Sequence, residues 1–182
     1  MSTYANPTPL GLISFGLTTI LLSLHNIGFL PNESSIMAMA IFVGGLAQIL
    51  AGLMEFFKAN TFGCVAFTSY GAFWWTLVGV WVLPKMGWSQ TNSADLVGAY
   101  MVLWGVFTFL MFFGTAKGPK LLRAVFGTLF IVFFLLAAHN LCESATAAVL
   151  AGALGVLCGG LAFYLGMAIV LHDELGKKLL PF

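Results

Sequence analysis

Residues 36–57 read IMAMAIFVGGLAQILAGLMEFF, an apolar run whose one charged residue, Glu55, comes near its end. A helix needs about 20 consecutive apolar residues to cross the hydrocarbon core of a bilayer. This run therefore predicts a membrane-spanning helix. Other runs of the same kind follow along the chain, so we expect an all-α membrane protein with one six-helix transmembrane domain. The expected spans are residues 10–29, 36–57, 63–83, 96–116, 121–141 and 145–171.

The composition agrees with a multi-pass membrane protein. Of the 182 residues, 60% are hydrophobic and 7% are charged, which is more apolar surface than a soluble chain of this length can bury. The net charge of +1 offers no electrostatic attraction for nucleic acid. The three cysteines lack metal-binding spacing. We expect neither an enzyme with catalytic residues nor a metal or cofactor site, and a location in the inner or plasma membrane.

The basic residues predict the orientation of the chain. With six spans, one lysine, Lys85, falls on one side of the membrane. All the other basic residues fall on the opposite side, and cytoplasmic loops carry the excess of Lys and Arg. Both termini are therefore expected in the cytoplasm. The residues on that side are Lys58, Lys117, Lys120, Arg123, Lys177 and Lys178.

No Lys, Arg, Asp or Glu lies near the middle of any span. A charge there would indicate an ion or proton relay, so its absence favours a channel, or a carrier whose solute brings its own proton. Uncharged side chains are expected to form the path instead. Gln48 is the most informative, because its amide needs partners in a dry environment; interhelical packing is the other interpretation. The expected path residues are Asn6, Thr18, Gln48, Thr68, Ser69 and Trp74.

Three ionisable side chains near span ends are interpreted as interfacial or proton-linked. Glu55, the deepest acid, is expected to pair locally with Lys58. His25 and His139 lie at similar depth near the outer face, as interfacial histidines or as the two ligands of a b-type haem. Each begins a His-Asn pair, followed 19 or 20 residues later by Gly-Gly-Leu-Ala. That echo would fit an old parallel duplication.

Residues 6–12 read NPTPLGL and are expected to form a stiff elbow before the first span. Each proline fixes its own φ and favours an extended residue before it. Thr8 is then the expected N-cap and Pro9 the first helical residue. Free N–H groups at such a helix start attract anions, which would place Asn6 at an entrance. A plain cap is the other interpretation.

This elbow, with Phe15-Gly16 after it, resembles the signature of the acetate uptake transporter family, which includes bacterial succinate–acetate permeases. Two further blocks carry the resemblance: GGLAQ at 44–48, and NTFG at 60–63 followed by FTSYGAFW at 67–74. FFGT at 112–115 also fits. Thr8 stands where alanine is usual, and the last two helices match more loosely.

The resemblance implies a homo-hexamer in the lipid bilayer, with a path through each six-helix protomer. Acetate and, in some members, succinate would pass, often together with protons. The resemblance also implies an apolar constriction that matches Phe15, Tyr70 and Leu129. These residues lie 5, 7 and 8 positions into their expected spans, about 8 to 12 Å deep at 1.5 Å per residue. An apolar ring at that depth would gate by excluding water.

Other functions are alternatives at this point. One is a channel for another small solute, such as formate or ammonium. Another is an electron carrier that holds haem between His25 and His139. A third is a structural or sensory membrane protein.

Overall fold

The computed structural model describes residues 4–30 and 34–181. Within this part of the chain, six helices are long and apolar enough to cross a membrane, as the sequence predicts. The second of them is divided into three consecutive segments. The helical elements are α1 (Thr8–Asn26), α2 (Ser34–Ala38), η1 (Met39–Ala47), α3 (Gln48–Phe57), α4 (Thr61–Val82), α5 (Ala94–Gly114), α6 (Lys120–Cys142) and α7 (Ala145–Leu175).

Glycines end the first and the last helix at positions that differ from the expected ones. After α1, Gly28 adopts a left-handed φ of 79° and its N–H bonds the carbonyl of His25. Gly176 does the same after α7, with a φ of 64° and a bond to the carbonyl of His172. Glycine adopts this conformation without a steric cost. Thus α1 stops before residue 29, and α7 continues beyond residue 171.

The middle of the second span is a π-helix rather than a regular α-helix. A π-helix shifts the backbone hydrogen bonds by one residue and is rare in proteins. One carbonyl in this stretch has a partner from the neighbouring helix: the indole N–H of Trp75 donates to the Ile41 oxygen at 2.9 Å. The sequence predicts the span but gives no signal for this local rewinding.

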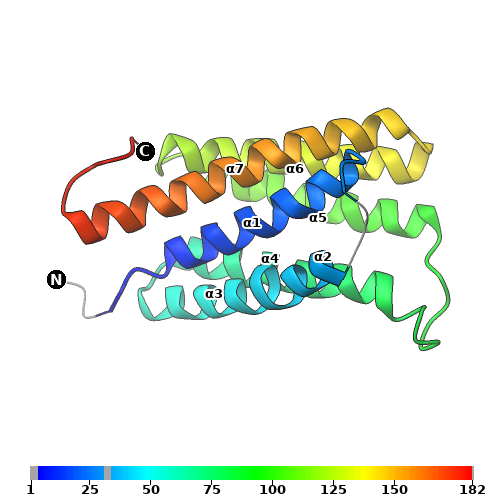
Figure 1. The fold of residues 1–182 in the computed structure, drawn as a ribbon, viewed down its shortest axis with the longest axis horizontal. Coiled ribbons are helices and arrows are strands. Elements are labelled where there is room, and N and C mark those ends of the chain that lie inside the picture. Colours follow the sequence, from blue (N-terminus) through cyan, green and yellow to red (C-terminus); the bar gives the residue numbers. More distant parts are fainter. Residues whose placement is uncertain (1–3, 31–33, 182) are drawn as a thin grey trace.

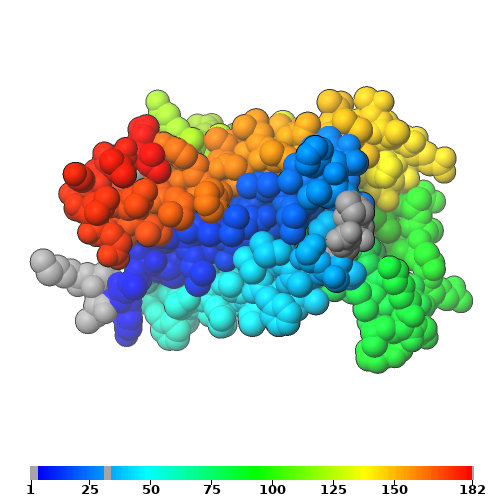
Figure 2. Space-filling view, viewed as in Figure 1, coloured from blue at the N-terminus to red at the C-terminus, as the bar shows by residue number. Residues whose placement is uncertain are grey.

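Figure 1 shows α1 crossing the bundle beside α7, and α1 begins at the same end at which α7 ends. Figure 2 shows these two helices in direct contact along most of their length. Sequential helices pack together in three cases: α3 with α4, α5 with α6, and α6 with α7. Across the longer connection, α4 and α5 meet through aromatic rings, with Phe73 centred 6.0 Å from Tyr100 and 5.2 Å from Trp104.

The contact between α1 and α7 depends on two facing glycines. A Cβ atom at Gly159 would lie 2.7 Å from the carbonyl oxygen of Gly16, and one at Gly16 would lie 2.6 Å from that of Gly159. Both distances are too short for a real contact, so neither backbone accepts a side chain here. Small residues at such points let membrane helices approach closely.

We predict that Gly159→Ala lowers the free energy of unfolding by about 1–3 kcal/mol, because the new methyl group forces two backbones apart. The matched control is Gly160→Ala, because a Cβ atom there meets nothing within 4 Å and alanine favours the helix by about 0.5–1 kcal/mol. Thermal unfolding in detergent micelles measures both. Equal stability of the two variants would contradict the contact.

Candidate functional site

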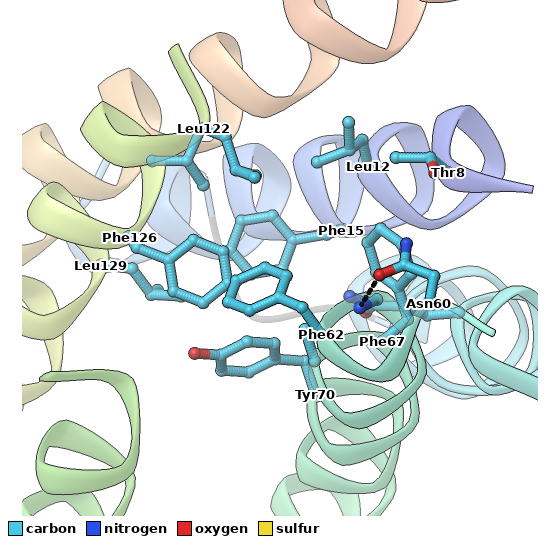
Figure 3. A pocket seen from close by; sticks show the side chains of 14 residues that line it. Thr8, Leu12, Phe15, Asn60, Phe62, Phe67, Tyr70, Leu122, Phe126 and Leu129 are labelled. Atoms are coloured by element: carbon cyan, nitrogen blue, oxygen red, sulfur yellow. Dashed lines mark hydrogen bonds between the residues drawn. The ribbon is translucent and has the colours of Figure 1, made fainter. Parts of the chain in front are cut away.

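A cavity of about 80 Å³ lies between α1, α3, α4 and α6. Around its mouth are Thr8 in the first turn of α1, Asn60 just before α4, and Leu122 in the first turn of α6 (Figure 3). All three positions belong to the end of the bundle at which α1 begins. A single water needs about 10–15 Å³ of such space. The cavity therefore has room for a molecule of several heavy atoms.

The three residues expected to form a constriction all line this cavity. Phe15, Tyr70 and Leu129 lie about two to three turns deeper than the mouth, on α1, α4 and α6, and each is less than 7% exposed. The rings of Phe15 and Tyr70 are 5.9 Å apart between centroids, tilted by 52°. The structure therefore brings together three side chains that lie far apart in the sequence.

Two further rings that the sequence analysis did not select fill the space beside them. Phe62 and Phe126 also line the cavity, with their centroids 5.2 Å apart, and Phe126 lies 6.0 Å from Tyr70 (Figure 3). Phe62 belongs to the NTFG block and could have been selected from it. Phe126 lies in an apolar run without a distinguishing pattern.

A hydrogen-bond chain fixes the orientation of Tyr70. Its hydroxyl donates to Oγ1 of Thr108 at 2.9 Å, and Thr108 in turn donates to the Trp104 carbonyl at 2.7 Å. Thr108 is fully buried on α5. The phenol oxygen therefore points away from the cavity, toward α5, and Tyr70 presents its ring to the cavity.

Gln48 is the one expected path residue that lines the cavity. Its side chain is 1% exposed, and its Oε1 has no hydrogen-bond partner among the described residues. A buried amide oxygen without a partner costs free energy. This atom is consequently available to a solute or a water in the cavity.

The other expected path residues lie outside the cavity lining. Thr18 is fully buried and donates to the Ser14 carbonyl of its own helix at 2.9 Å, while Trp74 is 2% exposed and its Nε1 lacks a described partner. Both side chains lie against Gly44. These two residues thus meet at a second location, the contact with Gly44, which lies deeper in the bundle than the mouth of the cavity.

The remaining three expected path residues lie neither at the cavity nor at the contact with Gly44. Thr68 packs against Gly52 on α3, and its Oγ1 has no partner in the described chain. Ser69 is half-buried. Asn6 is exposed, and its side-chain amide donates to Asp173 at the end of α7 at 3.4 Å.

The side chain of Glu55 is buried and differs from its expected arrangement. Its carboxylate is 1% exposed and accepts hydrogen bonds from the Thr8 hydroxyl and, at 2.8 Å, from Nδ2 of Asn60. The expected pairing with Lys58 is wrong, because α3 ends at Phe57 and the carboxylate turns inward.

The expectation that Thr8 is the N-cap of α1 is also wrong. Pro7 holds that position without a side-chain bond, and Thr8 is the first residue of α1.

His25 and His139 lie near the opposite end of the bundle, at the ends of α1 and α6. Each ring bonds the loop after its own helix through Nδ1: His25 to the Leu30 carbonyl at 2.9 Å, and His139 to the Ser144 carbonyl at 3.1 Å. Both partners are five residues further on. The two histidines therefore fix equivalent loops, as interfacial histidines do.

The family model described as the GPR1/FUN34/yaaH family matches residues 1–176. The chain belongs to this family. Among its relatives is the succinate-acetate/proton symporter SatP of Escherichia coli K12, 51% identical over 177 residues, which are 97% of this chain and 94% of the relative. A solved structure described as the bacterial acetate channel SatP matches with a TM-score of 0.97 at 50% identity and covers 99% of each chain.

A more distant member comes from yeast. The ammonia transport outward protein 2 of Saccharomyces cerevisiae is 33% identical over 170 residues, which are 88% of this chain and 60% of that protein. The names of these three relatives describe transport or channel proteins, and none describes an enzyme. This GPR1/FUN34/yaaH member is, like them, a multi-pass membrane protein.

We predict that Thr108→Val lowers the free energy of unfolding by about 1–3 kcal/mol, because the buried hydroxyl of Tyr70 then has no acceptor. Thr18→Val is the matched control: it is equally buried but loses only a bond to its own helix. Unfolding in detergent, followed by tryptophan fluorescence, compares the two. A loss for Thr18→Val as large as that for Thr108→Val would argue against a special role of the Tyr70 bond.

Proposed function

We propose that this protein moves small carboxylates, acetate above all and succinate as a second substrate, across a membrane through a path in each protomer. The observation that carries the proposal is the cavity between α1, α3, α4 and α6. It is apolar, it is lined by Phe15, Tyr70 and Leu129, and it is bordered by Gln48, whose unpartnered amide oxygen can accept a hydrogen bond from a water or from the O–H of a protonated acid. The names of the E. coli relative and of the solved structure support acetate and succinate as substrates.

The physics of the cavity favours weak, fast binding. Uncharged hydrogen-bond groups replace part of the water around a solute without holding it, which suits conduction. No lysine or arginine lines the cavity among the described residues, so a carboxylate meets no fixed countercharge there. We call the constriction formed by Phe15, Tyr70 and Leu129 the neck. A hydrated ion must lose water to pass the neck, whereas the methyl group of acetate packs favourably against apolar side chains.

The orientation of the path follows from the charges. Lys58, Lys117 and Lys178 represent the basic side of the chain, and the helix ends beside them are at the end where α1 begins. By the excess of basic residues in cytoplasmic loops, this end faces the cytoplasm. The cavity is then the cytoplasmic vestibule, both termini are cytoplasmic, and the membrane is the inner or plasma membrane.

The protomer is proposed to work as a single six-helix domain within a homo-hexamer. Support comes from the family resemblance and from large apolar side chains on the outer surface, such as Phe42, Leu103 and Phe113, each more than half exposed. Lipid tails or neighbouring protomers would cover them. The mass of the purified complex in detergent tests the assembly.

The decisive experiment is uptake of labelled acetate into proteoliposomes, with and without a pH gradient, with unlabelled formate, lactate and succinate as competitors. The proposal expects saturable uptake that acetate itself inhibits. Uptake no faster than in protein-free vesicles would contradict it. The name of the yeast relative makes ammonium the second candidate, so labelled methylammonium is measured in parallel.

We predict that Phe15→Ala raises the uptake of lactate several-fold relative to acetate, because the removed ring widens the neck. Phe73→Ala is the control for lost stability, since Phe73 is as buried as Phe15 but does not line the cavity. Both variants are compared in proteoliposomes at equal protein content. An unchanged lactate-to-acetate ratio for Phe15→Ala would remove Phe15 from the neck.

Gln48→Leu is expected to reduce acetate uptake about tenfold, because leucine keeps the volume but lacks both the Nε2 donor for a carboxylate oxygen and the Oε1 acceptor for the O–H of the protonated acid, and such a bond contributes about 1.4 kcal/mol. Gln90→Leu, on an exposed loop, serves as control. Unfolding temperatures of both variants separate a transport effect from a folding effect. Wild-type uptake by a folded Gln48→Leu variant would exclude Gln48 from the path.

A further inference from the structure

Glu55 is the one charged side chain that is buried among the described residues. It lies in the last turn of α3, and the other described acids, Asp95, Glu143, Asp173 and Glu174, are exposed. Burying a carboxylate is costly unless hydrogen bonds or a cation compensate it. A carboxylate kept at this place therefore calls for an explanation beyond solubility.

Both oxygens of Glu55 are held by residues of the cavity mouth. The Thr8 hydroxyl donates to Oε1, and the Asn60 amide donates to Oε2 at 2.8 Å. Thr8 and Asn60 themselves line the cavity. Glu55 thus stands directly behind the cavity wall, one side chain away from a solute, and joins α1 and α4 to α3.

The charged and titratable groups around Glu55 leave its charge unpaired. On its own segment, Lys58 is half-buried, and no ion pair joins it to Glu55 in the described part of the chain. On α4, the nearest titratable side chain along the sequence is the thiol of Cys64, while α1 has none at this end and the described second span has none besides Glu55. At the same end of the bundle, α7 carries His172 and Asp173, and Asp173 bonds Asn6.

We infer that Glu55 is the group that binds the proton coupled to carboxylate transport, and that it acts through the hydroxyl of Thr8. This inference rests on the proposed function, because it assumes that a carboxylate occupies the cavity. It goes beyond it by assigning the proton to one residue and its effect to one neighbour.

The exchange of hydrogen bonds gives the mechanism. A proton from water forms an O–H bond at Oε1 of Glu55, and this O–H donates to Oγ1 of Thr8. A hydroxyl has one hydrogen and can accept as well as donate. Once Thr8 accepts from Glu55, its own O–H no longer donates to Glu55 and can donate to a carboxylate oxygen in the cavity. Loss of the proton from Glu55 reverses each step and returns the Thr8 hydroxyl to Glu55.

Electrostatics act in the same direction. An ionised Glu55 repels a carboxylate in the cavity across a poorly solvated wall, and a protonated Glu55 does not. Proton and carboxylate therefore favour each other's binding, and the coupling must be reciprocal. Asn60 remains a donor to the second oxygen in both states, so α4 keeps its position while the hydroxyl of Thr8 changes partner.

The test measures acetate binding to the full-length protein in detergent by calorimetry. Across the pH range in which acetate stays ionised, any pH dependence of the affinity belongs to the protein. For one linked proton, the wild-type affinity should fall as the pH rises, by up to about tenfold per pH unit. Titrations in two buffers with different heats of ionisation should show proton uptake on binding.

Glu55→Gln reproduces the protonated state, because its amide can donate to Thr8 and its oxygen can accept from Asn60. We predict that this variant binds acetate without pH dependence, near the affinity of the wild type at the acidic end, and takes up no proton. Glu174→Gln, an exposed acid at the same end of the bundle, is the control and should keep the wild-type profile. Thr8→Val should lose affinity at acidic pH, and Thr8→Ser should retain it.

The possible outcomes separate a failure of the inference on Glu55 from a failure of the proposed function. A wild type that binds acetate equally at every pH and takes up no proton overturns the inference but leaves the proposed function in place, and this measurement does not depend on any variant folding. A Glu55→Gln variant with the wild-type pH profile overturns it as well. A protein that neither binds acetate at any pH nor transports it contradicts the proposed function itself.

Discussion

The interior of a bilayer contains no water to satisfy hydrogen-bonding groups, and this constraint governs where each polar group of the chain lies. Several threonines in the spans meet it locally, as Thr18 does with the carbonyl of Ser14. Tyr70 meets it across the bundle through Thr108. Against this background, the free oxygen of Gln48 stands out because it borders a cavity. This unsatisfied atom therefore distinguishes the cavity as a place where a solute or a water can bind.

Helix α1 makes two kinds of contact through neighbouring faces, because Gly16 directly follows Phe15 and successive residues are about 100° apart around a helix. One face approaches α7 so closely that Gly16 and Gly159 touch through their backbones. The other face carries Thr8 and Phe15 to the mouth and to the neck of the cavity. Because α1 is held against α7 without intervening side chains, the position of Phe15 is set by backbone contacts rather than by flexible packing. A rigid neck is what a selective apolar constriction needs.

The sequence was sufficient for the spans because each is a long apolar run, and the bilayer leaves few alternatives to a helix. It was insufficient where geometry depends on a single turn. Lys58 follows Glu55 at a spacing that suits a helical ion pair, but α3 ends at Phe57 and Ala59 takes a left-handed φ of 54°. The chain therefore turns at this point, and the carboxylate binds Thr8, a residue 47 positions away.

The candidate site was likewise predicted in part from the sequence and in part not. The family resemblance selected Phe15, Tyr70 and Leu129, and they do share one cavity, whereas spacing alone would have treated them as ordinary core residues. The polar path was predicted from residue type and depth, and only Gln48 reached the cavity. Which face of a helix a threonine occupies depends on the rotation of that helix. In the second span, which carries Gln48, the π-helical stretch changes the rotation of the helix in a way that no pattern in the sequence indicates.

The His-Asn and Gly-Gly-Leu-Ala echo in the sequence coincides with matching contacts in the two helices that carry its histidines. His25 and His139 bond carbonyls five residues ahead in the same manner, although the loops they fix differ in sequence. Phe15 and Leu129 each precede their histidine by ten residues, and both line the cavity from α1 and α6. Equivalent turns of two related helices would thus supply two of the three neck residues. The repeated Gly-Gly pairs have diverged: Gly159 touches the backbone of α1, whereas Gly44 receives Thr18 and Trp74. A duplication that kept its histidine caps and neck positions but changed its glycine contacts would give one packed side and one side open to a solute.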